Sequence, residues 1–181
     1  MKEMDYLKKF QSYLDPSELD SAVIEGSQET PHDRLLIYGG QDYKQRERII
    51  EVTSQIQQLG QNLGPSNTQN DYLRVQFQVT LPFKVEELAG RDVASLLLFL
   101  NKLMELPGWE FNELEDQINY RYVLLSKSDG IDENLFAGLV GLILLICQLF
   151  TEVIEQIVSG KKSFNELMEE VLKIANKDAT P

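Results

Sequence analysis

The clearest pattern of apolar and polar positions lies in residues 72–83, YLRVQFQVTLPF. Every second residue is apolar, and these residues are Leu73, Val75, Phe77, Val79, Leu81 and Phe83. Such alternation predicts a strand with one buried face and one solvated face, as in an antiparallel sheet covered on one side. We expect the first four of these residues to face helices, with Arg74, Gln76 and Gln78 on the opposite face.

The most apolar run, residues 135–147, is too short for a typical membrane span. A bilayer needs about 20 apolar residues, whereas a run of about 10–14 more often marks a buried core helix. The flanks SDGIDEN and TEVIEQ are acidic, with neither a Lys/Arg bias nor an aromatic belt. We therefore predict the core helix of a soluble protein over about residues 131–159, buried on all sides at first and amphipathic later.

Three small residues, Ala137, Gly138 and Gly141, lie within this predicted helix. Glycine inside a helix costs about 0.5–1 kcal/mol relative to alanine, so the close approach of another backbone would explain it. Tight packing against the chain's own sheet is the favoured interpretation, and a subunit interface is the alternative.

A second apolar helix is predicted over VASLLLFLNKLM, residues 93–104, and Pro107 with Gly108 ends it. It is apolar nearly all round, which indicates deep burial or a contact with a second subunit. The residues that we predict for a homodimer contact are Leu96, Leu98, Phe99 and Leu103. The chain's own long helix is the alternative cover for them.

Weaker patterns predict the other elements. The first 14 residues carry a helical stripe, and DPSE at residues 15–18 has the features of a second helix start. Residues 49–59 fit a helix or a strand, and we favour a strand because it follows a plausible turn and precedes another strand. Residues 60–71 are a predicted loop, and residues 109–126 a predicted hairpin.

A final acidic helix begins at the capping box SFNE, residues 163–166. We expect it to turn its apolar side chains inward, namely Leu167, Val171 and Ile174.

These elements predict an α+β fold, with an antiparallel sheet of about five strands, a meander plus a hairpin, covered by helices. Residues 31–160 would form this domain. Residues 1–30 would be an N-terminal helical extension, and residues 161–181 a C-terminal helix and tail.

Composition narrows the range of partners and compartments. The chain has 17 Lys and Arg residues against 29 Asp and Glu, a formal charge of −12. Such a surface repels nucleic acid and anionic lipid, so we expect neither nucleic acid nor a membrane as a partner. The start MKEMDYLKKF lacks the apolar region of a secretory signal. The sequence therefore predicts a soluble, cytoplasmic protein.

Residues typical of catalysis or metal binding are scarce. His32 is the single histidine, so one chain cannot form a histidine-based metal centre. Cys147 lies in apolar surroundings, which disfavour a reactive thiolate. The glycines of YGGQDYKQ are better explained by a strand turn than by a phosphate loop. One acidic group lacks the ligand spacing of a calcium loop: Glu110, Glu113, Glu115 and Asp116. We expect no catalytic residues, cofactor or metal, and thus not an enzyme.

Three segments and the long apolar helix together resemble a known family. The segments are LPF (residues 81–83), LLLFLNKLMELPGWEF (96–111) and YRYVLL (120–125). They resemble the YbjN-like family of bacterial sensory-transduction regulators, which shares the fold of the class I type III secretion chaperones. The resemblance covers residues 34–160, and its motifs are structural: Leu100, Asn101, Pro107, Gly108 and Trp109.

The resemblance implies a small acidic homodimer that binds other polypeptides without ATP. The resulting hypothesis is a non-enzymatic protein-binding module, chaperone-like or regulatory. The alternative is a small-molecule or regulatory sensor with a pocket between sheet and helices. A binding module should expose an apolar groove with a polar rim, whereas a sensor should form a concave pocket with convergent polar groups.

Overall fold

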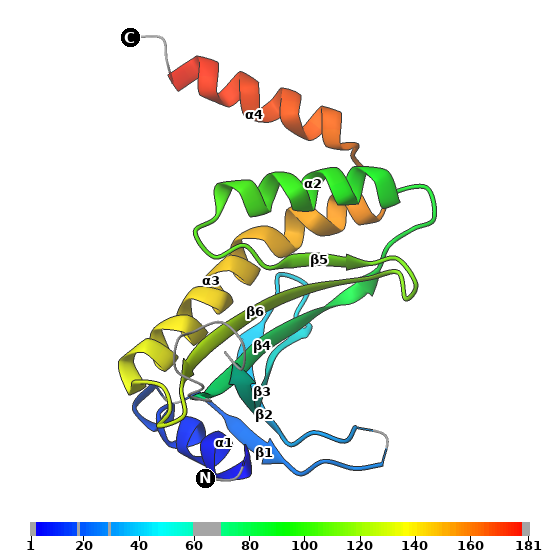
Figure 1. Cartoon of the computed structure of the whole chain (residues 1–181). Helices are drawn as coiled ribbons and strands as arrows, with labels where there is room; N and C mark the ends of the chain where they lie inside the picture. The colour runs from blue at the N-terminus through cyan, green and yellow to red at the C-terminus, as the bar shows by residue number, and fades with distance from the viewer. Residues whose placement is uncertain (1–2, 18, 29, 60–69, 179–181) are drawn as a thin grey trace. The chain divides into compact units, whose positions relative to one another are not determined.

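The computed structural model describes residues 3–17, 19–28, 30–59 and 70–178 (Figure 1). Over these residues the chain is α+β, with one antiparallel sheet of six strands in the order β1-β2-β3-β4-β6-β5. The predicted fold class is confirmed, with one strand more than expected.

The bounds of the elements agree with most of the sequence predictions. The helices are α1 (Glu3–Ser12), α2 (Gly90–Leu103), α3 (Glu133–Val158) and α4 (Phe164–Asp178). The strands are β1 (Ser21–Ile24), β2 (Arg34–Gln41), β3 (Glu47–Leu59), β4 (Asn70–Lys84), β5 (Trp109–Asn112) and β6 (Gln117–Lys127). Residues 49–59 are therefore a strand, as favoured. The predicted loop at residues 60–71 lies almost entirely outside the described residues.

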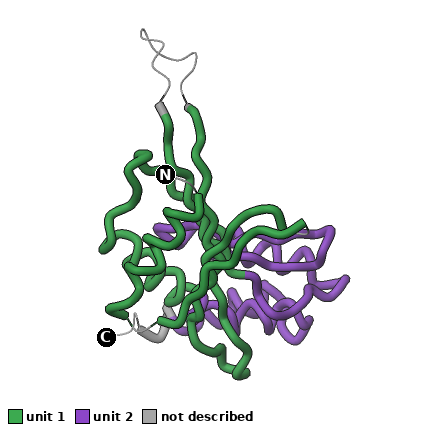
Figure 2. The backbone as a smooth tube through the Cα atoms, turned by 90° about the horizontal axis from the view of Figure 1, so that it is seen from below, with its two compact units in different colours: residues 1–79, 121–146 green, residues 80–120, 147–181 purple. Residues whose placement is uncertain are grey.

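The chain divides into two compact units (Figure 2). Unit 1 comprises Met1–Val79 and Arg121–Ile146, and unit 2 comprises Thr80–Tyr120 and Cys147–Pro181. The strands β4 and β6 and the helix α3 each contribute residues to both units. The domain boundaries predicted at residues 30 and 160 stay a prediction.

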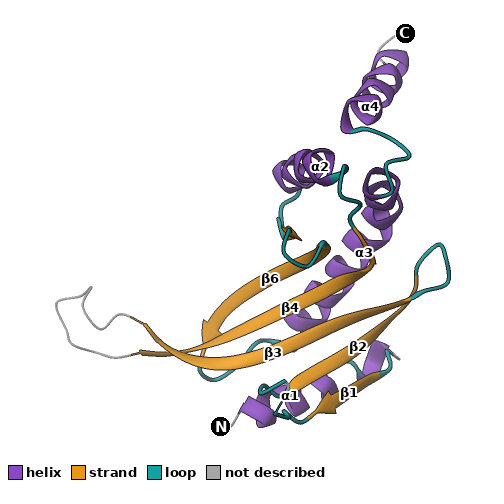
Figure 3. Ribbon diagram, turned by 90° about the vertical axis from the view of Figure 1, so that its right-hand side faces the viewer, coloured by secondary structure: helices purple, strands orange, loops and turns teal. Residues whose placement is uncertain are grey.

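In unit 1, the apolar face of the sheet is formed by alternate residues of β2, β3 and β4. The strands β3 and β4 lie side by side (Figure 3), and their antiparallel pairing places Val52 opposite Phe77 and Ser54 opposite Val75. The side chains of the inner face are almost completely buried: Leu35, Ile37, Ile50, Val52, Leu73, Val75, Phe77 and Val79. The predicted register of β4 is therefore confirmed.

Helices α1 and α3 supply the other half of this core. The ring of Phe136 on α3 stacks on Phe10 of α1 with centroids 4.7 Å apart, and it lies 5.5 Å from the ring of Phe77. Tyr6 donates a hydrogen bond from its hydroxyl to the carbonyl oxygen of Ser128. Gly39 of β2 leaves room for the side chain of Leu144, because a Cβ at residue 39 would overlap it. Packing thus explains one glycine of the YGG sequence.

The helix predicted from Asp15 is wrong. A three-residue 3-10 helix, η1 (Asp15–Ser17), is followed by β1, which pairs with β2 through Ala22 opposite Leu36. The sequence SELD after Pro16 has a single apolar residue, so a helix there would have no apolar face to bury. Glu18, the last residue of DPSE, lies outside the described residues.

The prediction that the first part of α3 is buried on all sides is also wrong. Leu135 and Leu145 are 49% and 50% exposed, although Phe136 and Ile143 are fully buried on the other side. A Cβ on Gly138 or Gly141 would meet no atom within 4 Å, so these glycines do not pack against the chain's own sheet. A helix on a sheet buries only one side, and the hydrophobicity of the sequence overstates its burial.

The described residues include one helix that is long enough and apolar enough to cross a membrane, and this helix is α3. The core helix of a soluble protein meets the same criteria of length and composition. The fully buried side chains along α3, among them Phe136, Ile143 and Ile154, are consistent with a soluble core.

Asp42 holds the turn between β2 and β3. Its Oδ1 accepts hydrogen bonds from the backbone N–H groups of Lys44 (2.8 Å) and Arg46 (3.0 Å), and its Oδ2 lies 2.6 Å from the Arg46 guanidinium. Burial raises the pKa of Asp42, but the hydrogen bonds and charge of Arg46, with the Lys44 N–H, outweigh burial and leave the pKa lowered. An ionised Asp42 therefore stabilises this turn at neutral pH.

In unit 2, α2 and the predicted hairpin β5–β6 are joined by a turn that Asn101 anchors. Its Oδ1 accepts hydrogen bonds from the N–H groups of Gly108 (3.1 Å) and Trp109 (3.0 Å), and its Nδ2 donates to the Trp109 carbonyl (2.9 Å). The Trp109 ring meets the Tyr120 ring edge-on, with centroids 5.2 Å apart. The residues of the LNKLMELPGW sequence thus have a structural role.

Candidate functional site

Three of the four residues predicted for a dimer contact are at least partly accessible. Leu98 and Leu103 on α2 are 72% and 63% exposed, and Phe99 is half-buried. Leu96 is buried, so it belongs to the core of unit 2. The helix is therefore amphipathic, with an accessible apolar side.

Helix α4 contacts α2 at its first residue and carries further accessible apolar side chains within unit 2. Its capping box forms as predicted, since Glu166 accepts a hydrogen bond from the N–H of Ser163 (2.7 Å). Phe164 at its start meets the Phe99 ring edge-on, with centroids 6.1 Å apart. Phe164, Leu167 and Met168 are half-buried, but Val171 and Ile174 are exposed. The prediction that these two side chains turn inward is wrong.

We call the accessible apolar side chains of these two helices the α2–α4 surface: Leu98, Phe99, Leu103, Val171, Leu172 and Ile174. An isolated helix of about 12–15 residues is only marginally stable in water, and packing of its apolar side normally stabilises it. The apolar side of α4 lacks such packing, because Leu172 is 57% exposed among the described residues.

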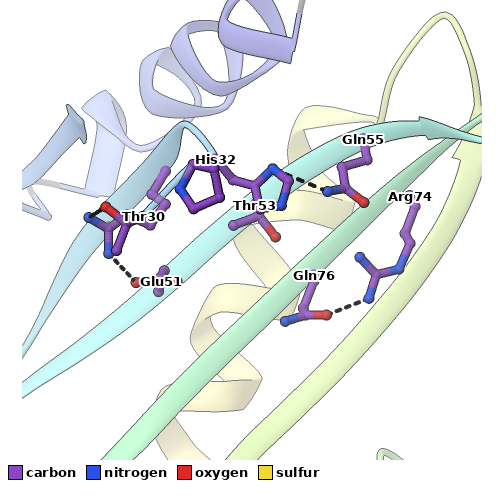
Figure 4. Close-up of a pocket in the computed structure, with 9 residues that line it drawn as sticks. Thr30, His32, Glu51, Thr53, Gln55, Arg74 and Gln76 are labelled. Atoms are coloured by element: carbon purple, nitrogen blue, oxygen red, sulfur yellow. Dashed lines mark hydrogen bonds and ion pairs between the residues drawn. The ribbon is translucent and has the colours of Figure 1, made fainter. Parts of the chain in front are cut away.

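A polar pocket of about 350 Å³ lies in unit 1, on the sheet face opposite to the apolar core (Figure 4). The strands β2, β3 and β4 and the segment before β2 all contribute to its lining. Its lining residues are Thr30, Pro31, His32, Arg34, Glu51, Thr53, Gln55, Arg74 and Gln76. Antiparallel pairing of β3 with β4 places Thr53 opposite Gln76 and Gln55 opposite Arg74.

The two arginines of the pocket have different surroundings. Arg34 donates to Glu51 Oε2 (3.1 Å) and to the hydroxyl of Thr30 (3.3 Å), so a carboxylate offsets its charge. Arg74 donates to the neutral side-chain oxygen of Gln76. In the described parts of the chain, no carboxylate lies within ion-pair distance of Arg74.

His32 and Gln55 close one side of this pocket. The Nε2 of Gln55 lies 3.4 Å from Nδ1 of His32 (Figure 4). With His32 neutral, two arginines and one glutamate give the lining a formal charge of +1. This sign is opposite to that of the chain, whose formal charge is −12. The pocket is thus a locally positive site on an acidic protein.

The sequence placed some of these side chains correctly and missed the site. Arg74 and Gln76 were assigned to the solvated face of β4, and that assignment is confirmed by the structure. His32 lies before β2, and the pairing of β2 with β3 brings it beside Gln55. Cys147 is fully buried in α3, as expected of a small apolar side chain. In the described residues, no group of three or more His, Cys, Asp or Glu side chains could hold a metal ion.

No family model matches this chain, and no curated protein matches its sequence.

Proposed function

We propose that this protein is a non-enzymatic, cytoplasmic protein-binding module that acts as a homodimer on a polypeptide partner. The observation that carries the proposal is the α2–α4 surface, where leucine and isoleucine side chains remain more than half exposed. Exposed apolar patches on soluble proteins commonly mark interaction sites. The resemblance to the YbjN-like family and the type III secretion chaperone fold supports the same kind of function.

Charge favours this surface as the place where two copies meet. Each copy carries a formal charge of −12, so two copies repel each other, and the burial of neutral apolar side chains at the contact is what would offset this repulsion. Leu98, Phe99 and Leu103 are neutral and lie on one helix. A two-fold axis near α2 would place each of these side chains against the partner copy and remove them from water.

A competing contact is the exposed side of α3 in unit 1. It carries Leu135, Leu142 and Leu145 around Gly138 and Gly141, which have open space where a Cβ would be. Glycines in such a position allow a second helix to approach closely. A subunit interface at Gly138 and Gly141 therefore remains a proposal. The variants below distinguish a dimer contact on α3 from one on α2.

The dimer is tested by sedimentation at micromolar concentration, with circular dichroism to check folding. The unmutated chain should sediment at twice its mass of 20.8 kDa. Leu98→Asp should stay folded and shift toward the monomer, because it places a charge in the contact. Leu96→Asp should unfold, because Leu96 is buried in the chain itself. Leu142→Asp should remain dimeric.

Two results would contradict this assignment. A 20.8 kDa monomer for the unmutated chain ends the homodimer proposal. Dissociation by Leu142→Asp, with Leu98→Asp still dimeric, moves the contact from α2 to α3.

Polypeptide binding is tested by affinity capture from the source cell with matched variants of α4. We expect a protein that co-purifies with the unmutated chain and with Lys173→Asp, and that is lost with Leu172→Asp. The lysine variant changes charge at a neighbouring exposed position and leaves the apolar side intact. A partner lost equally with both variants would be held by charge rather than by the α2–α4 surface.

The alternative, a small-molecule sensor, is favoured by one observation, the polar pocket. Its hydrogen-bonding groups converge as a sensor site requires. The pocket lies on the solvated face of β2, β3 and β4, in contrast to the location between sheet and helices that the alternative assumed.

A further inference from the structure

We propose that the polar pocket binds a carboxylate group, with Arg74 as its anchor. This site is distinct from the α2–α4 surface, because its lining residues all belong to unit 1 and the surface to unit 2. Its test is therefore independent of the α2–α4 surface and of the proposed dimer.

Arg74 is the residue best suited to anchor an anion. A guanidinium has five N–H donors, and Arg74 uses one nitrogen, Nη2, to donate to Gln76. The other arginine of the lining, Arg34, is engaged by Glu51 and Thr30. A carboxylate matches the fork of a guanidinium and can accept two parallel hydrogen bonds from it.

One uncompensated positive charge favours a carboxylate over a phosphate. The lining has a formal charge of +1, which a monoanion neutralises, whereas a phosphate dianion would leave a net negative charge beside Glu51. The lining residues come from three strands and the segment before β2, so no helix N-terminus adds N–H groups for phosphate oxygens.

The rest of the lining indicates that the ligand carries more polar groups. The amide of Gln55 and the hydroxyl of Thr53 can each donate and accept hydrogen bonds, whereas the amide of Gln76 already accepts from Arg74 and donates to Gln78 (3.1 Å) and keeps one further N–H. The volume of about 350 Å³ falls within the range of small-molecule sites, about 300–1,000 Å³, and is larger than one carboxylate requires. A small organic acid with amide or hydroxyl groups fits this lining. An acidic side chain of a bound polypeptide would present the same carboxylate.

The test is an NMR titration of the full-length, ¹⁵N-labelled chain at constant ionic strength. The probes are acetate, N-acetylglutamine, the neutral N-acetylglutamine methylamide, inorganic phosphate, and a blocked Gly-Asp-Gly peptide. Acetate and N-acetylglutamine should shift the amide signals of Thr53, Arg74 and Gln76 in a saturable way. The methylamide should shift none of them, and phosphate should bind more weakly than the carboxylates.

The peptide distinguishes the two sources of the carboxylate. Tighter binding of the peptide than of the free acids assigns the site to an acidic side chain of a polypeptide, and weaker binding assigns it to a free organic acid.

Variants at two lining residues should move the affinity in opposite directions. Arg74→Gln should weaken carboxylate binding about tenfold or more, because it removes a charge-assisted hydrogen bond. Arg74→Lys keeps the charge without the fork and should give an intermediate loss. Glu51→Gln should strengthen binding several-fold. The matched control is Arg91→Gln, which removes the same charge from an exposed position on α2 and should leave the affinity unchanged.

The proposal is overturned if no carboxylate probe gives saturable shifts at these residues. It is also overturned if phosphate binds more tightly than the carboxylates, or if Arg74→Gln and Arg74→Lys both bind as the unmutated chain does. Leu98→Asp should leave the titration unchanged, which separates this result from the fate of the dimer.

Discussion

Replacing Phe136 with alanine should lower the free energy of unfolding by about 3–5 kcal/mol, the usual cost of truncating a buried phenylalanine. Its ring is fully buried and lies 4.7 Å from the Phe10 ring and 5.5 Å from the Phe77 ring. Alanine at residue 136 would leave a cavity among α1, β4 and α3. Urea unfolding followed by far-ultraviolet circular dichroism measures the loss.

Leu142→Ala is the control on the same helix. Leu142 lies on the exposed side of α3, so its truncation should change stability by about 0.5 kcal/mol or less in the monomeric chain. A loss below about 1 kcal/mol for Phe136→Ala would mean that α1 and α3 do not form the core described above.

Replacing Asn101 with alanine should cost about 2–4 kcal/mol, because it removes three hydrogen bonds at once. The N–H groups of Gly108 and Trp109 and the carbonyl of Trp109 would lose their partners. The chain has a single tryptophan, so the fluorescence of Trp109 reports directly on this turn. A red shift of its emission should accompany the loss of stability.

Asn101→Asp separates the roles of the two side-chain atoms. It retains the acceptor oxygen for the N–H groups of Gly108 and Trp109 and loses the donor to the Trp109 carbonyl. We expect a smaller loss of stability than for alanine. The second carboxylate oxygen would face the Trp109 carbonyl oxygen, so equal losses in the two variants would show that this repulsion offsets what the retained acceptor contributes.

The sequence predicted the elements whose pattern is local. Alternation along β4 determined its register, because a shift by one residue would have exposed Val75 and Phe77 and buried Arg74. The strand β1 was missed because its four residues, SAVI, are too few to establish a pattern. Its position depends on pairing with β2, which no local signal encodes.

Burial was predicted less well than helix formation. Leu98, Leu145 and Ile174 lie in helices that were expected, yet all three are at least half exposed. An apolar side chain indicates that its burial is favourable. The sequence does not show whether the same chain or a second chain buries it. For this reason the accessible sides of α2, α3 and α4 became visible only in the structure.

The pocket shows a similar limit for polar residues. The alternation of β4 placed Arg74 and Gln76 on the solvated face, but it gave no sign of their neighbours. The register of β3 against β4 brings Gln55 opposite Arg74, and the path of the chain before β2 adds His32. Residues separated by tens of positions in sequence meet there, so the charge of the site follows from strand pairing.

The order of the elements has a consequence for synthesis on the ribosome. The apolar face of β2, β3 and β4 is complete once Val79 has emerged, but Phe136 of α3, which packs on it, is made later. At about 5–20 residues per second, this delay lasts on the order of several seconds. Of the two helices that cover this face, α1 and α3, the ribosome has made α1 but not yet α3 during that interval. Until α3 is made, the apolar side chains of these strands lack the cover that Phe136 provides, and slower translation ahead of α3 prolongs that interval.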